Sequence, residues 1–157
     1  MRDPLQDRLR KLRAWGPGDR GLLAVATGTL PLIALGLRVV GFERLFGQLE
    51  RWSGQPAPAA LESDATRAWR TRQLVDAAPR HGLYRGNCLS RSLTLWWLLR
   101  RQRIGSELRI GVRRGDRGIA AHARVESAGR VLNDTPDVAT RHVSFDQPIV
   151  PRRLTLR

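Results

Sequence analysis

The chain has 157 residues, of which 41% are hydrophobic and 27% are charged, a composition that fits a globular protein and excludes a disordered one. Lys and Arg total 28 against 14 Asp and Glu, so the formal net charge is +14 and charge alone favours an acidic partner. A single cysteine excludes an intrachain disulfide and a cysteine-based metal cluster, and it fits a reducing cytoplasm.

Residues 1–52 are predicted to be helical. Apolar residues recur at helical spacing near the start of this region, at Leu5, Leu9 and Leu12. The stretch Gly16-Pro17-Gly18-Asp19 breaks the pattern, and Asp19 is the expected N-cap of a second helix. Towards Trp52 the apolar residues again share one face, at Phe42, Leu45, Phe46 and Leu49. These segments predict two or three amphipathic helices that pack on another element.

The second of these helices contains an apolar run, residues 22–37, that carries no charge. The run is shorter than the roughly 20 residues that a membrane-spanning helix needs, and Pro31 interrupts it. These features favour a helix buried in the protein or in an interface, and a membrane contact of residues 20–52 is the weaker alternative. No export-type cleavage site follows the run, so we expect no signal peptide and a cytoplasmic protein.

Residues 53–60, rich in Pro and Ala, form the predicted linker to a second region, residues 61–157. The first helix of that region is expected to begin near Leu61 or Ser63 and to stop before Pro79. Its apolar positions are Ala65, Trp69, Leu74 and Val75.

A stronger helical pattern runs from about Asn87 to Arg103 and is expected to end at Gly105, in the style of a C-terminal glycine. The rest of the chain has the alternation and turn residues of strands. The expected strands are residues 107–112, 118–126, 130–134 and, at the edge of the sheet, 143–150. A tight turn at residues 127–129 joins the second strand to the third. Helices followed by antiparallel strands predict an α+β fold.

Cys88 is the first candidate for chemistry. It lies in Arg85-Gly86-Asn87-Cys88-Leu89, at the first turn of the stronger helix. A thiol there faces unpaired backbone N–H groups and the positive end of the helix dipole, and both favour the thiolate. Its own backbone N–H is suited to an oxyanion hole. A buried structural cysteine is the alternative explanation.

Two further residues complete a candidate catalytic set. His122 lies in the middle of a predicted strand between small residues, where another element can approach an imidazole acting as general base. Asp134 follows the hairpin, which brings it near His122, and a carboxylate there would hold the imidazole tautomer. Each residue singly has an ordinary structural explanation. The order Cys, His, Asp on a helix start, a strand and the next strand indicates a catalytic site much more specifically than any one of the three residues does.

The stretch GNCLSRSLTLWWLLRRQRIGSELRIGV, followed by AAHARVE and GRVLND, resembles the lasso-peptide B2 proteins, leader peptidases with a transglutaminase-like (papain-like) fold. The resemblance covers residues 61–146. It implies that Cys88 is the nucleophile, that His122 is the general base and acid, and that Asp134 orients His122. It also implies that the leader of a ribosomally made precursor peptide (a RiPP precursor) is removed through an acyl-enzyme, without a metal or cofactor.

Three more residues are weaker candidates for the substrate pocket. Tyr84 lies four residues before the cysteine, and Asn87, the expected N-cap, directly precedes it. Arg124 stands where the B2 family often carries Trp, so we expect a different side chain beside the site.

The resemblance also implies partners. The N-terminal region lacks the strand-rich pattern of a fused leader-binding domain, so we expect a separate B1 protein (a RiPP recognition element) to bind the leader, and the lasso cyclase is a further candidate. The net charge of +14 fits an acidic leader. No nucleic-acid partner is expected, because the arginines are spread along the chain instead of forming a stripe with interleaved aromatics.

Two other classes of function stay open at this point. The same three residues serve a transglutaminase-type acyl transfer to an amine, which also uses a thiolate. A basic, non-enzymatic module that binds nucleic acid or a membrane would make the three residues coincidental.

Overall fold

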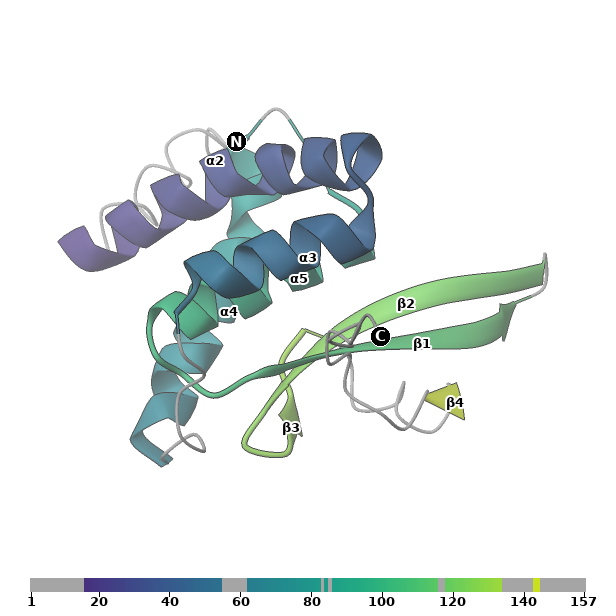
Figure 1. The fold of residues 1–157 in the computed structure, drawn as a ribbon. Helices are drawn as coiled ribbons and strands as arrows, with labels where there is room; N and C mark the ends of the chain where they lie inside the picture. The colour runs from purple at the N-terminus through teal and green to yellow at the C-terminus, as the bar shows by residue number, and fades with distance from the viewer. Residues whose placement is uncertain are drawn as a thin grey trace, which may run out of the picture.

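A computed structural model describes residues 16–54, 62–82, 84, 86–115, 118–133 and 143–144. Residues 1–15, with the first predicted helix, and Asp134 lie outside this described part. The helices are α2 (Pro17–Val39), α3 (Phe42–Trp52), α4 (Glu62–His81) and α5 (Cys88–Arg101). The strands are β1 (Glu107–Gly115), β2 (Gly118–Ser127), β3 (Arg130–Val131) and β4 (Val143–Ser144). The helices gather on one side of the β1–β2 ribbon, and α5 contacts both of these strands (Figure 1). The predicted α+β fold is confirmed.

The described strands form one antiparallel sheet in the order β3-β2-β1-β4. The β2–β3 turn holds Ala128 at φ 49° and Gly129 at φ 72°, and two consecutive positive φ angles are typical of a tight hairpin turn. β3 ends at Val131, earlier than predicted, although Leu132 N–H still donates to the carbonyl of Val125 at 2.9 Å. β4 pairs with β1 at the predicted edge. The rest of that predicted strand, residues 145–150, lies outside the described residues.

Helix α2 begins at Pro17 with Gly16 as its N-cap, so the prediction that Asp19 is the N-cap was wrong. Proline suits the first helical position because its φ is already helical and its missing N–H is not needed there. Asp19 instead lies in the first turn and accepts hydrogen bonds from Arg70 of α4. The bond from Arg70 lowers the pKa of the Asp19 carboxyl, and the contact ties α2 to α4.

The apolar run of α2 is buried on one face only. Its inward residues are Leu23, Ala26, Leu30 and Ile33. Its outward face is also apolar, with exposed Val25, Leu32, Leu35 and Val39. By length and composition alone this 23-residue helix, whose most apolar 18-residue stretch has a mean hydropathy of 1.8, is long and apolar enough to cross a membrane. Its buried face nevertheless packs against α4 and α5 as an ordinary helix of the fold.

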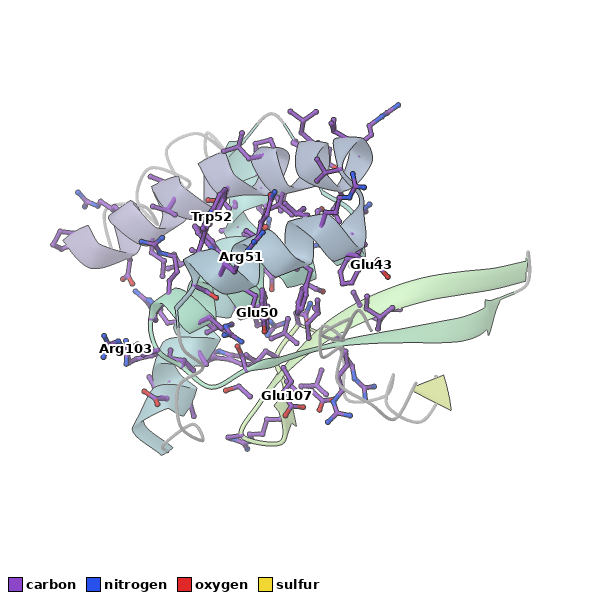
Figure 2. All side chains as sticks on the ribbon, viewed as in Figure 1. Glu43, Glu50, Arg51, Trp52, Arg103 and Glu107 are labelled. Carbon is purple, nitrogen blue, oxygen red and sulfur yellow. The ribbon has the colours of Figure 1, made fainter. Side chains whose placement is uncertain are left out.

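Helix α3 belongs to the same core as α4 and α5. Leu45, Phe46 and Leu49 are buried on one face, as predicted. The ring of Phe46 stacks on Trp96 of α5 with 4.6 Å between ring centroids. The charged residues of α3 that Figure 2 labels are Glu43, Glu50 and Arg51, and they lie outside this core. One hydrophobic core therefore joins the helices, and the division at residues 53–60 stays a prediction.

Helix α4 runs through Pro79 to His81, so the prediction that it stops before Pro79 was wrong. A proline removes one helical hydrogen bond, but Val75 and Ala78 are buried around it and hold this turn in the core. Gly82 N–H then donates to the carbonyl of Ala78 at 2.9 Å and closes the last turn.

Helix α5 also ends differently from the prediction at Gly105. Arg103 adopts φ 58°, and Ile104 N–H donates to the carbonyl of Leu99 at 2.9 Å, the pattern of a Schellman C-cap. Ile104 is fully buried (0% exposed), so the chain turns into the core at Arg103, two residues before the glycine where the cap was predicted.

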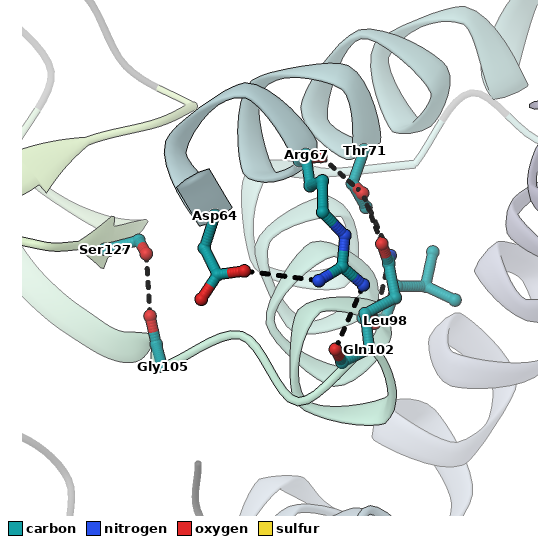
Figure 3. Close-up of polar contacts among 7 residues, drawn as sticks. All are labelled: Asp64, Arg67, Thr71, Leu98, Gln102, Gly105 and Ser127. Carbon is teal, nitrogen blue, oxygen red and sulfur yellow. Dashed lines mark hydrogen bonds and ion pairs between the residues drawn. The ribbon is translucent and has the colours of Figure 1, made fainter. Parts of the chain in front are cut away.

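Polar contacts fix this end of α5 to its neighbours. Gln102 Nε2 donates to Thr71 Oγ1 of α4 at 2.9 Å, and Ser127 Oγ of β2 donates to the carbonyl of Gly105 at 2.6 Å (Figure 3).

Candidate active site

Cys88 is the first residue of α5 and is exposed, which removes the alternative of a buried structural cysteine. A capping box holds the helix start: Asn87 Oδ1 accepts from Ser90 N–H at 2.8 Å, and Ser90 Oγ accepts from Asn87 N–H at 3.1 Å. The first N–H groups of a helix have no carbonyl partner within it, so they stabilise negative charge beside the thiol. The sequence around Cys88 thus predicted both its position and the N-cap correctly.

The cap itself can be tested. Asn87→Ala is expected to lower the free energy of unfolding by about 1 kcal/mol, because Ser90 N–H loses its acceptor. The same variant removes a hydrogen bond that holds the turn carrying Cys88. Asn87→Ser keeps a capping oxygen and is the matched control, and it should stay within a few tenths of a kcal/mol of wild type by urea unfolding. Equal losses for both variants would contradict the role of the cap.

Cys88 and His122 line the same pocket, of about 120 Å³. The pocket lies where α4, α5 and β2 meet. Its lining residues are Val75, Asp76, Cys88, Arg91, Leu95, His122, Ala123 and Asn133. Sequence reasoning chose the two residues of this lining that carry nucleophile and base chemistry, and the fold brings together residues 34 positions apart in the chain (from Cys88 to His122).

Hydrogen bonds tie the helix that carries Cys88 to the strand that carries His122. Ser92 Oγ donates to the carbonyl of Ala123 at 2.7 Å. Asn133 Nδ2 donates to Ser92 Oγ at 2.6 Å, and Asn133 Oδ1 accepts from Val125 N–H at 2.7 Å. The sequence analysis did not select Ser92 or Asn133, although Asn133 directly precedes the predicted catalytic Asp134.

One wall of the pocket carries a charged group that the sequence analysis also missed. The carboxylate of Asp76 pairs with Arg91 at 2.5 Å and with Arg72 at 3.2 Å. Arg91 Nη2 donates to Asp76 Oδ1, and Arg72 forms an ion pair with Asp76 Oδ2 from the same helix. Asp76 therefore orders the wall between α4 and α5, and Arg72 at i−4 of Asp76 was the one signal of this cluster in the sequence.

The other predicted site residues do not all gather here. Asp134 lies outside the described residues. Tyr84 is exposed, Asn87 serves as the N-cap, and Arg124 pairs with Glu126 at 2.8 Å. Among the described residues that line the pocket, none of these three weaker candidates is present.

Comparison with known proteins gives one match. The model of a family described as the transglutaminase-like superfamily matches residues 32–145, a span that contains Cys88, His122 and Asp134. No curated protein and no solved structure matched the chain. The matched span begins inside α2, which agrees with the packing of this helix on α4 and α5.

Proposed function

This chain belongs to the transglutaminase-like superfamily, and on that premise we propose that it is a cysteine peptidase that removes the leader from a lasso precursor peptide. The observation that carries the proposal is the shared pocket of Cys88, at a helix N-terminus, and His122, on a neighbouring strand. The motifs around Cys88 and His122, which resemble those of the lasso B2 proteins, supply the substrate class.

The proposed reaction has two steps. The Cys88 thiolate attacks the scissile carbonyl, and the oxygen that becomes negative is stabilised by backbone N–H groups at the start of α5. The bond to nitrogen then breaks, His122 gives a proton to the leaving amine, and a thioester to Cys88 remains. Water, deprotonated by His122, attacks the thioester and releases the leader as a carboxylic acid. In the proposal, Asp134 orients His122.

The substrate and partner follow from charge and from the resemblance. A protein of net charge +14 attracts an acidic leader peptide and raises its local concentration. We propose that a separate B1 protein presents the leader and that the freed amine of the core peptide passes to the lasso cyclase. The proposed compartment is the cytoplasm.

The test is cleavage of a candidate precursor peptide, mixed with its leader-binding protein and followed by mass spectrometry. Wild type is expected to cut at one position, and Cys88→Ala is expected to leave the peptide intact because no other thiol exists in the chain. Cleavage by both proteins would reject Cys88 as nucleophile. The absence of cleavage by wild type, with the leader shown to be bound, would reject the peptidase.

The same experiment separates the alternatives. A mass increase on a glutamine-containing peptide with an intact backbone, as an added amine replaces the ammonia of the glutamine side-chain amide, would indicate transglutaminase-type acyl transfer, since an acyl-enzyme is open to an amine as well as to water. Salt-sensitive binding to DNA or to anionic vesicles that is unchanged in Cys88→Ala, without any turnover, would indicate the non-enzymatic module.

A further inference from the structure

We propose that Ser92 and Asn133 form a positioning bracket that sets the distance between Cys88 and His122, and this inference rests on the catalytic pair of the proposed function. The bracket is defined by the hydroxyl of Ser92 and the side-chain amide of Asn133. Neither group needs to touch substrate for this role. Their hydrogen bonds connect the catalytic helix to the catalytic strand at the level of the site.

Ser92 stands one helical turn after Cys88, on the same side of α5. Its side chain is fully buried, at 0% exposed. The hydroxyl donates to the carbonyl of Ala123, the neighbour of His122, at 2.7 Å. A shift of β2 along or away from α5 would break this bond, so the bond couples the position of His122 to that of Cys88.

Asn133 completes the bracket from the other side. Its Nδ2 donates to Ser92 Oγ at 2.6 Å, and its Oδ1 accepts from Val125 N–H of β2 at 2.7 Å. The hydroxyl of Ser92 thus accepts one hydrogen bond and donates another, which fixes its rotation. Asn133 also lines the pocket and directly precedes Asp134 in the chain.

Near His122, side chains rather than a neighbouring strand hold β2 on the side of β3. β2 pairs with β3 only at Glu126 and Ser127, because β3 ends after two residues. Beyond the end of β3, the carbonyl of Ala123 therefore accepts from the Ser92 hydroxyl, and the N–H of Val125 donates to the Asn133 side chain. Buried backbone groups are almost always hydrogen-bonded, and here two of them are satisfied by residues that also fix the site.

The expected effect is on chemistry rather than on binding. A displacement of about 1 Å between reacting groups costs roughly 10²-fold in rate. Ser92→Ala is therefore expected to lower kcat for leader cleavage by about 10²-fold, with KM within about threefold of wild type. Thr94→Val is the matched control, because Thr94 is an equally buried hydroxyl whose hydrogen bond lies within α5, to the carbonyl of Ser90 at 2.8 Å.

A second readout does not depend on the substrate. Cys88 is the only thiol in the chain, so its alkylation by iodoacetamide at pH 7 reports how well His122 promotes the thiolate. Ser92→Ala is expected to slow alkylation about tenfold when His122 is present, and less than twofold in a His122→Ala background. Asn133→Ala should give the same loss, and the double variant Ser92→Ala/Asn133→Ala should lose no more.

The controls decide the outcome. The proposal is overturned if Ser92→Ala slows alkylation by the same factor with and without His122, or if Thr94→Val matches the loss of Ser92→Ala. If Ser92→Ala lacks the circular dichroism spectrum of a folded protein, Asn133→Ala carries the same test. Coupled alkylation in a wild type that cuts no precursor would support the bracket while rejecting the peptidase, so the two proposals fail separately.

Discussion

His122→Ala is expected to lower kcat/KM for leader cleavage by roughly three orders of magnitude, within the 10²- to 10⁴-fold range of general acid–base catalysis. His122 lines the pocket of Cys88 and is the one histidine among the described residues of that lining. Without it, the described lining holds no imidazole to take the proton from the thiol or to give one to the leaving amine. The measurement is the initial rate of cleavage over a range of precursor concentrations.

Arg124→Ala is the matched control for this variant, since Arg124 lies two residues further along β2 and pairs with Glu126 outside the pocket. Cleavage by Arg124→Ala should stay within about threefold of wild type, because the Arg124 side chain pairs with Glu126 and does not line the pocket. A His122→Ala variant as active as the Arg124→Ala control would remove His122 from the mechanism.

Phe46→Ala is expected to destabilise the whole protein by about 3–5 kcal/mol, the usual cost of deleting a buried aromatic ring. Phe46 is 5% exposed, and its ring stacks on Trp96 of α5 with 4.6 Å between ring centroids. It also stacks on Phe42, with 5.5 Å between centroids. Because α5 carries Cys88, loss of this contact also removes packing from the helix of the active site. Urea unfolding followed by circular dichroism measures the change.

Trp52→Ala, on the same helix, is the control because Trp52 is 68% exposed. Its free energy of unfolding should change by less than about 0.5 kcal/mol, as for most surface substitutions. If Phe46→Ala also changed it by so little, α3 would be an independent appendage instead of a part of the core. The same result would favour the predicted division of the chain near residues 53–60.

Several local features of the structure were predicted from the amino-acid sequence alone. Asn87 before Cys88 predicted a capped helix start, because an Asn side chain satisfies the N–H groups that a helix leaves open. The turn at Ala128 and Gly129 was predicted from a glycine between two runs of strand-forming residues. Both are decided by residues within a few positions of each other, so the amino-acid sequence suffices.

Two of the wrong predictions, both about where a helix ends, share one cause. Helix α4 continues through Pro79, and α5 ends at Arg101 with its C-terminal cap closed at Arg103 instead of Gly105. In both places the residue preference is opposed by burial, of Ala78 in one case and Ile104 in the other. Local preferences of this kind amount to about 1–3 kcal/mol, and the burial of neighbouring apolar side chains, at about 25 cal/mol per Å² of apolar surface, acts on the same scale.

The sequence by local pattern thus determined the helix start that exposes Cys88, the strand that bears His122 and the α+β order of elements. Only the tertiary structure decided that α2 and α3 share the core, that Asp76 of α4 pairs with Arg91 of α5 at the pocket, and that Ser92 and Asn133 join α5 to β2. These contacts join residues from different elements. Their partners are chosen by packing in three dimensions, which no spacing along the chain encodes.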